Sequence, residues 1–461
     1  MINKIHSDSG EVLISVSPLI DARAQTREPH IPQPQSRPQQ PLPQNGRQAE
    51  LSPIHDFMSK LLQPGVVETL KEYVRWQAAW REGRTQGVSF ETALESIPDR
   101  APLSINLDVT TACNYRCDHC VDMDILNTGI SYDHEKLKDS LSLLMDKGLK
   151  SVIIIGGGEP TAYPGFEDIV RHLKARDTRI GVVTNGSLMK KINAVADVLG
   201  KGDWVRLSLD SGSNDTFRRM HKPGSKKCTL EWICEQIAPI KALNADFQIG
   251  FSFIIVWNDC EANDTQIIEN IHEIRAATEL AKRSRFDYIS LKPFLTRAES
   301  NNAEIVELVK ERDKIREVVS RIREEIKQAK ALEDDSFRVI ESTNLRVLEN
   351  ESYRDYTEQP HNCHMQYFRQ VMSPLGVFNC PVYRHVPQAL LGGKHAYAEH
   401  DIFAATQRNT LRLIEAFDAT EECKEVTCLY NHANWFIEDL IRNPEKLDHL
   451  KTSEERQDYF L

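Results

Sequence analysis

The stretch LSINLDVTTACNYRCDHCVD (residues 103–122) joins a strand-like segment to three closely spaced cysteines. Residues 103–110 have the composition of a β-strand. Cys113, Cys117 and Cys120 follow with the spacing C-x3-C-x2-C. A structural zinc site normally has four ligands, and His119 directly precedes Cys120, which is poor geometry for binding the same ion. Three interpretations are open: a structural metal site, part of a disulfide framework, or an iron–sulfur cluster with three protein ligands.

The strand at 103–110 is the first of six strand-like segments separated by helical ones. The other predicted strands are 151–157, 180–186, 204–210, 247–256 and 287–295, and the predicted helices include 133–147, 165–176, 229–243 and 264–282. Apolar strands that alternate with helices are typical of a parallel sheet covered by helices. The pattern predicts an α/β fold, a partial TIM-like (β/α)6 barrel, with chemistry at the C-terminal ends of its strands.

The flanking segments differ in composition from this core. Residues 28–47 contain six prolines and many glutamines, a composition that cannot form a packed core. We expect a disordered tail over 1–50, either dispensable or partner-recruiting. The other expected segments are a helical N-terminal segment (51–100), the barrel (101–300), a connecting helix (301–345, with a charged amphipathic run at 302–330), a cysteine-rich extension (346–435) and a C-terminal helix or tail (436–461).

The overall composition excludes several classes of protein. The chain has 461 residues, a formal net charge of −11 and 27% charged residues, which argues against a nucleic-acid binder with a basic face. Its apolar runs are strand-sized, far below the roughly 20 residues of a membrane span, and the N-terminus lacks a secretory signal. We therefore expect a cytoplasmic protein without membrane contact, whose ten cysteines are ligands or free thiols rather than disulfides.

Unusual residues stand at the ends of the predicted strands. The second strand ends in GGGEP (156–160), where glycines allow close backbone approach and Glu159 adds a carboxylate. The third ends in Thr-Asn-Gly with Asn185, which alone is also typical of a turn. Ser208 and Asp210 alternate at the end of the fourth strand, and Ser290 and Lys292 at the end of the sixth, so each pair shares a face. Internal structural polar groups and a lysine extended to solvent are the alternatives.

The cysteine triplet and these strand ends, in this order, resemble the radical S-adenosylmethionine (SAM) superfamily over residues 103–295. The resemblance implies that Cys113, Cys117 and Cys120 hold a [4Fe–4S] cluster whose open iron binds SAM. One electron then cleaves SAM to a 5′-deoxyadenosyl radical that abstracts hydrogen from a substrate. The resemblance further implies that His119 lies beside the adenine, and that SAM is contacted by Gly157, Gly158, Glu159, Asn185, Ser208 and Asp210. For Lys292 two ligands are open, the SAM carboxylate and an anionic substrate.

A second set of cysteines follows the predicted barrel: Cys363, Cys380, Cys423 and Cys428. VMSPLGVFNC (371–380) has the pattern of a hairpin with its turn at 374–376. The set is similar to the twitch form of the SPASM extension, which implies an auxiliary [4Fe–4S] cluster. It departs from that pattern, because only three residues separate Gly376 from Cys380 and the last pair is C-x4-C. A zinc site and unligated thiols are the alternatives.

Three cysteines stand outside both sets: Cys228, Cys234 and Cys260. Incidental buried thiols are the plain interpretation. Cys260 follows the fifth predicted strand near the expected barrel mouth, where a radical epimerase needs a hydrogen donor, so it is the one candidate catalytic thiol.

Three functions are weighed. The first is a radical SAM oxidoreductase-type enzyme that oxidises, dehydrogenates or epimerises a small polar metabolite, reduced by a partner such as flavodoxin or ferredoxin. The second is a SPASM-type maturase that modifies a precursor peptide, although residues 1–97 show no pattern of a peptide-binding winged helix. The third is a non-enzymatic metal scaffold, which the strand-end residues disfavour.

Overall fold

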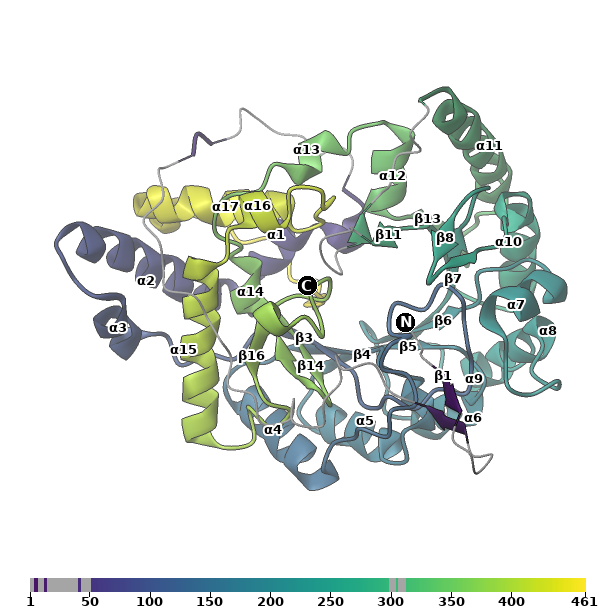
Figure 1. The fold of residues 1–461 in the computed structure, drawn as a ribbon, viewed down its shortest axis with the longest axis horizontal. Coiled ribbons are helices and arrows are strands. Elements are labelled where there is room, and N and C mark those ends of the chain that lie inside the picture. The colour runs from purple at the N-terminus through teal and green to yellow at the C-terminus, as the bar shows by residue number, and fades with distance from the viewer. Residues whose placement is uncertain (1–3, 7–11, 15–39, 43–50, 298–303, 306–311) are drawn as a thin grey trace.

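A central sheet of ten strands organises the chain (Figure 1). This computed structural model describes residues 4–6, 12–14, 40–42, 51–297, 304–305 and 312–461. Seven strands of the sheet are adjacent in chain order and parallel: β3 (Ser104–Leu107), β4 (Ser151–Ile154), β5 (Arg179–Thr184), β6 (Trp204–Ser208), β7 (Gln248–Ile255), β10 (Tyr288–Pro293) and β13 (Arg338–Glu341). The α/β prediction is confirmed: the six predicted strands are present in the predicted order, and β13 adds a seventh.

The cysteine-rich extension adds strands to the other edge of the sheet. β14 (Arg369–Ser373) pairs in parallel with β3, and β15 (Gly376–Phe378) and β16 (Leu390–Gly392) continue antiparallel. The predicted hairpin with its turn at 374–376 is therefore present. Among the described strands, the sheet order leaves β13 and β16 as two open edges. The sheet is thus a partial barrel that the extension enlarges, rather than a barrel followed by a detached module.

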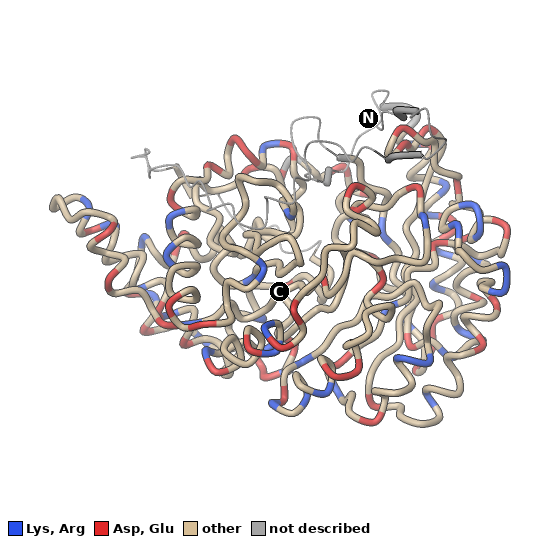
Figure 2. Tube along the Cα trace, turned by 60° about the horizontal axis from the view of Figure 1, so that its bottom comes forward, with Lys and Arg blue, Asp and Glu red and all other residues tan. Residues whose placement is uncertain are grey.

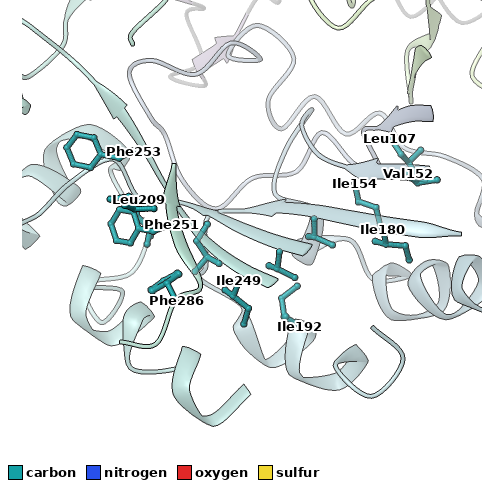
Figure 3. Packing of buried hydrophobic residues seen from close by; sticks show 14 of the residues in the cluster. Leu107, Val152, Ile154, Ile180, Ile192, Leu209, Ile249, Phe251, Phe253 and Phe286 are labelled. Carbon is teal, nitrogen blue, oxygen red and sulfur yellow. The ribbon is translucent and has the colours of Figure 1, made fainter. Parts of the chain in front are cut away.

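Helices cover the outer face of the curved sheet (Figure 1). They are α4 (His134–Asp146), α5 (Phe166–Lys174), α6 (Met189–Val195), α7 (Asn214–His221), α8 (Leu230–Cys234), α9 (Ile237–Leu243), α10 (Ile274–Arg283) and α11 (Arg312–Lys330). Fully buried strand residues such as Leu107, Ile154 and Phe251 belong to the core between sheet and helices (Figure 3). Because side chains alternate along a strand, the intervening polar residues face the inside of the curve, which we call the lumen.

A second core lies beside the sheet. The N-terminal helices α1 (Phe57–Leu61) and α2 (Val67–Thr85) contact α17 (Asn431–Arg442). Tyr73 of α2 stacks on Tyr367 at a ring-centroid distance of 4.5 Å. This core also uses α14 (Met365–Phe368) and α15 (His400–Ala416). The predicted helical content of residues 51–97 is confirmed, with α3 (Phe90–Ala93) as its last α-helix. The remaining short helices are α12 (Thr343–Glu349), α13 (Arg354–Thr357) and α16 (Ala419–Glu422).

Two predicted helices begin later than their periodicity indicated. Residues 261–266 form a small hairpin, β8 (Glu261–Ala262) with β9 (Thr265–Gln266), so the helix predicted from 264 begins only at Ile274. Asn263 and Asp264 have positive φ values of 50° and 57°, a conformation that Asn and Asp tolerate in turns. In the predicted run from about 302, Glu304–Ile305 pair as β12 with β11 (Thr296–Arg297) and are not helical, and α11 is described from Arg312.

The helix predicted over 229–243 is interrupted between α8 and α9, at Glu235 and Gln236. Of the predicted tail, only the strand pair β1 (Lys4–His6) and β2 (Val12–Ile14) and residues 40–42 are described. The expected disorder of residues 1–50 otherwise lies outside the described residues. No helix in the described part of the chain is both long enough and apolar enough to span a bilayer. Acidic and basic positions are interspersed along the trace (Figure 2).

The last residues cross the N-terminal ends of the central strands. The Ser151 hydroxyl, at the start of β4, donates to the Tyr459 carbonyl at 2.8 Å. The Phe460 ring packs edge-on to Trp204, at the start of β6, with centroids 5.4 Å apart. Lys60 of α1 donates to the Phe460 carbonyl at 2.7 Å. This end of the sheet is therefore covered, which leaves the opposite, C-terminal mouth for chemistry.

Candidate active site at the mouth of the sheet

The predicted cysteine triplet lies in the loop that follows β3. The Cys113 amide donates to the Asn127 side-chain oxygen at 2.9 Å. The Asn127 amide in turn donates to the Thr111 carbonyl at 2.8 Å. These two hydrogen bonds fix the first cysteine of the loop. All three thiols are partly buried. Burial, followed by the charges of Cys120 and Cys113, raises the pKa of Cys117 well above its ordinary value. Cys113 and Cys120 therefore lie near enough to Cys117 for their charges to act on it.

The glycines of GGGEP let this loop pack against the end of β4. A Cβ added to Gly158 would lie 2.1 Å from the Ala112 carbonyl oxygen, and one on Gly157 would lie 2.5 Å from the Thr110 oxygen. Gly157 also has φ +68°, in the region that favours glycine. The predicted need for close backbone approach is therefore met by the cysteine loop itself.

Glu159 binds the ends of β4 and β5 together. One carboxylate oxygen accepts from the Thr161 amide at 3.0 Å and from the Thr161 and Thr184 hydroxyls at 2.5 and 2.6 Å. The other accepts from the Asn185 amide at 2.7 Å. The Asn185 side chain in turn donates to Asn114 of the cysteine loop at 2.9 Å. The carboxylate and the amide that the sequence singled out thus hold three strand-end loops in fixed positions.

Asp210 stands between two histidines. Its Oδ2 lies 3.4 Å from Nε2 of His119 and 3.4 Å from Nε2 of His221, while its Oδ1 accepts from the Ile254 amide at 2.7 Å. Burial opposes ionisation of this carboxyl, but the neighbouring His119 and His221 rings hold the pKa of Asp210 below its usual value. The three side chains bring one ligand atom each within 4.8 Å of the others, which is also a spacing suited to a cation.

His221 connects this trio to the cysteines. Its Nδ1 lies 3.2 Å from the Cys117 sulfur, and its backbone carbonyl accepts from the Arg116 amide at 3.2 Å. Burial lowers the pKa of His221 to about 4, which favours a neutral ring beside the thiol. The chain Cys117–His221–Asp210–His119 therefore links the triplet to the end of β6.

Ser208 and Lys292 lie on the lumen face, as their alternation predicted. The paired residues Ser208, Ser252 and Ser290 form one row across β6, β7 and β10. The Lys292 ammonium donates to the Ser252 hydroxyl at 3.3 Å. Predicted Ser208 and Lys292 thus belong to one polar surface inside the curve of the sheet.

A buried ionic cluster joins this mouth to the C-terminal extension. Arg384 donates to Asp122 at 2.6 Å and lies 3.6 Å from Asp108. Asp122 also accepts from the Gly157 amide at 3.1 Å. Burial and the neighbouring Asp122 charge raise the pKa of Asp108 to about 8, although the Arg384 charge acts in the opposite direction. Arg384 thus ties the extension to the cysteine loop beside Cys120.

The second cysteine set also converges. After burial, the charges of Cys428, Cys363 and Cys380 raise the pKa of Cys423 well above normal. All four thiols are partly exposed, and Asn434 donates to the Cys363 sulfur at 3.5 Å. Four residues separated by up to 65 positions in the sequence therefore lie near enough for their charges to act on one another. Four thiolates of this kind are able to ligate an iron–sulfur cluster or a zinc ion.

The remaining candidate, Cys260, is 4% exposed and belongs to the main hydrophobic core. It follows β7, as predicted. The neighbouring Asn263 donates to the Asp118 and Cys120 carbonyls at 2.8 and 3.2 Å. Its loop thus packs on the cysteine loop, while the thiol itself is surrounded by apolar side chains.

Four residues of this mouth were not singled out from the sequence: Asp108, Asp122, His221 and Arg384. A signal existed for Asp108, because the alternation Ser104–Asn106–Asp108 places three polar residues on one face of a strand. His221 is the last residue of α7 and belongs to the basic run RRMHKPGS (218–225), whose first four residues are helical and not part of a loop. No local sequence pattern indicated Asp122 or Arg384, because the two residues pair with each other across 262 positions of the sequence.

Comparisons with known proteins agree with this geometry. Residues 107–265 match the family model of the radical SAM superfamily. A GTP 3′,8-cyclase from Helicobacter pylori is 28% identical over 213 residues, 42% of this chain and 65% of that protein. An S-adenosylmethionine-dependent nucleotide dehydratase from a Thermoplasmatales archaeon is 33% identical over 108 residues, 23% of this chain and 38% of that protein. The alignments thus span less than two thirds of either relative.

Among solved structures, Streptococcus suis SuiB bound to S-adenosylmethionine aligns with a TM-score of 0.47 and 13% identity, over 67% of this chain and 68% of that one. Residues 107–265, which carry the cysteine triplet at the mouth of the parallel α/β sheet, thus match a radical SAM domain.

Proposed function

We propose that this enzyme cleaves SAM reductively and removes a hydrogen atom from a small polar substrate, which is thereby oxidised or epimerised. The observation that carries the proposal is the convergence of Cys113, Cys117 and Cys120 at the C-terminal mouth of the parallel strands. Three thiols from one loop fit a [4Fe–4S] cluster with one iron left for SAM. When bound, that cluster supplies the electron that cleaves SAM to a 5′-deoxyadenosyl radical.

The chain's own residues then position SAM and hold the loops around it. The proposed SAM contacts are His119, Gly157, Gly158, Glu159, Asn185, Ser208 and Asp210, and Lys292 is proposed to bind an anionic group of the substrate. Their convergence supports this assignment: Glu159 and Asn185 are tied to the cysteine loop, and Asp210 to His119. Because Glu159 already accepts four hydrogen bonds, we expect it to orient the loops and to act on the SAM ammonium through its negative charge.

Cys363, Cys380, Cys423 and Cys428 are proposed to hold an auxiliary [4Fe–4S] cluster. The mutual effect of their charges supports a common centre. The extension that carries them adds strands directly beside β3, so the two cysteine sets share one sheet. We propose a flavodoxin or ferredoxin as the reductant.

The relatives' names favour a small-molecule substrate. Both are named for reactions of nucleotides, GTP in one case, which supports a small polar substrate over the alternative of a precursor peptide. The two net reactions differ in what they need after hydrogen abstraction. An epimerase needs a second hydrogen donor, for which Cys260 is the candidate, whereas an oxidation needs none.

The decisive experiment measures 5′-deoxyadenosine after anaerobic iron–sulfur reconstitution, with SAM and dithionite. The unmodified protein should release it, and Cys117→Ala should release none. Cys234→Ala is the matched control, because Cys234 is buried in the core on α8, and it should retain activity. Absence of 5′-deoxyadenosine from the fully loaded protein, or its persistence in Cys117→Ala, would contradict the proposal.

A further inference from the structure

Three basic side chains from separate strands face the lumen of the sheet. Arg206 lies on β6 between Val205 and Leu207, which are fully buried in the outer core, so the alternation of the strand points Arg206 to the opposite face. Lys292 occupies the corresponding face of β10, where its ammonium reaches Ser252. Arg369, at the start of β14, donates to Asn106 of β3 at 2.7 Å.

Neither arginine forms a salt bridge within the described part of the chain, although the Asp210 carboxylate acts on Arg206 from a distance. Arg206 has no hydrogen bond or salt bridge there, and its Nε is buried without a partner. Its guanidinium lies 5.1 Å from the centre of the Trp204 ring, yet the side chain keeps some accessible surface. Arg369 donates to the neutral Asn106 and Tyr430 side chains, and its charge acts on the Cys380 thiol. An enclosed guanidinium that takes part in no salt bridge is costly, so a ligand that supplies a paired anion is expected.

Hydroxyl groups line the same lumen. Ser208, Ser252 and Ser290 are paired in register across three neighbouring strands. The Ser290 hydroxyl is buried and has no hydrogen-bond partner. Arg206 precedes this row by two residues on β6, and Lys292 follows it by two residues on β10. The serine hydroxyls therefore lie between Arg206 and Lys292 along the strand direction.

The charges of Arg206, Lys292 and Arg369 all act on one residue, His55. After burial, the charges of Lys60, Lys292, Arg206 and Arg369 hold the pKa of His55 well below its usual value. Lys60 is itself paired with Asp458 at 3.1 Å. The other three cations act at one place although they come from β6, β10 and β14.

We infer that the lumen binds the phosphate group of a phosphorylated small-molecule substrate through Arg206, Lys292 and Arg369, with Ser252 and Ser290 as hydroxyl donors. Several positive charges and separate donors suit a group with two negative charges and several acceptor oxygens better than a single carboxylate. The inference rests on the proposed function, because it names the chemical class of its substrate.

The position of this site fits a substrate that reaches the SAM mouth. Ser208, the last residue of β6, lies two residues beyond Arg206, which corresponds to roughly 7 Å at about 3.3 Å per residue. A phosphate held at the level of Arg206 leaves that length for the reacting part of the molecule. The anionic end would thus be anchored toward the covered end of the sheet, with the reacting end beside the cysteine loop.

Calorimetric titration of the reconstituted full chain with inorganic pyrophosphate tests the inference. We expect binding by the unmodified protein, at least a tenfold loss of affinity in Arg206→Met and partial recovery in Arg206→Lys. Arg171→Met is the matched control, since Arg171 is an exposed residue of α5 paired with Asp197, and it should bind like the unmodified protein. Far-ultraviolet circular dichroism and iron content check that each variant is folded and loaded.

A second titration, with citrate, separates phosphate from carboxylate recognition. Binding of citrate without pyrophosphate would overturn the phosphate assignment. Equal pyrophosphate affinity in Arg206→Met and the unmodified protein, or no binding by either, would overturn the site. Release of 5′-deoxyadenosine from the unmodified protein is measured separately: its absence, with pyrophosphate binding intact, would contradict the proposed function and not the anion site.

Discussion

Single residues at the mouth of the sheet act mainly by holding distant segments in contact. Gly158 packs on Ala112, Asn185 on Asn114 and Arg384 on Asp122. Each contact joins the cysteine loop to another loop. The positions of the three thiols therefore depend on residues that carry no metal-binding group.

Gly158→Ala tests this dependence. The added methyl group would meet the Ala112 oxygen at 2.1 Å, so the cysteine loop must shift. We expect a loss of about 1–3 kcal/mol in the free energy of unfolding and poorer retention of iron, measured by denaturant unfolding and iron analysis. Gly393→Ala, where nothing lies within 4 Å of the added Cβ, is the control. Equal behaviour of the two variants would show that the loop tolerates the shift.

Asp108 gives a prediction about pH. Its folded pKa is raised to about 8, whereas an unfolded aspartate titrates near 3.9. Between about pH 4 and pH 8 the folded state keeps a proton that the unfolded chain has lost, so this carboxyl makes the protein less stable as pH rises. Asparagine cannot lose that proton. Asp108→Asn should therefore gain stability relative to the unmodified protein as pH rises from 5 to 8.

Urea unfolding at both pH values measures that gain. Asp197→Asn is the control, because Arg171 lowers the pKa of the exposed Asp197 and its titration lies below this window. A stability difference for Asp108→Asn that does not change between pH 5 and pH 8 would show that Arg384 keeps Asp108 ionised.

The sequence predicted the residues whose chemistry depends on local spacing. Cys113, Cys117 and Cys120 follow a strand as expected, and Ser208 and Lys292 face the lumen because alternation is a local property. Arg206 follows the same alternation but was not singled out. An arginine between apolar residues in a sequence gives no indication that its side chain is without a salt-bridge partner in the fold. Asp122 and Arg384 were beyond prediction, because their pairing depends on the position of β14 beside β3.

At the scale of elements, strands were predicted more accurately than helices. The strands are short apolar runs that the sheet buries, so composition alone defines them. The segments at 261–266 and 296–305 contain few apolar anchors, and local turns and two-residue pairings replaced the expected first turns of two helices. The cysteine-rich hairpin was predicted correctly, but its pairing with β3 is a long-range contact that no local pattern encodes.

The C-terminal segment is the element whose role the sequence least revealed. Phe460 is 7% exposed and packs on Trp204. Phe460→Ala should lower the free energy of unfolding by about 3–5 kcal/mol, the usual cost of a buried Phe-to-Ala change, as measured by denaturant unfolding. Leu243→Ala, at a side chain that is 67% exposed, should stay within about 0.5 kcal/mol. A small effect of Phe460→Ala would mean that the segment detaches without disturbing the sheet.

At the scale of the whole molecule, the two cysteine sets belong to one framework. The triplet follows β3, and Cys380 follows β15, which is joined to β3 through β14. Arg384, four residues after Cys380, reaches Asp122, two residues after Cys120. The ionic cluster of Arg384, Asp122 and Asp108 therefore occupies the space between two sites that are 243 residues apart at their closest cysteines.

This arrangement predicts two centres that load independently. The anaerobically reconstituted protein should bind about eight irons, four per cluster. Replacing Cys363, Cys380, Cys423 and Cys428 by alanine should leave about four irons and the 5′-deoxyadenosine activity, because the triplet belongs to a different loop. Replacing Cys113, Cys117 and Cys120 should leave about four irons and no activity. Iron and zinc analysis of the three proteins decides the matter: four irons with one zinc in the unmodified protein would make the second centre a zinc site, and loss of both centres together would show that they fold as one unit.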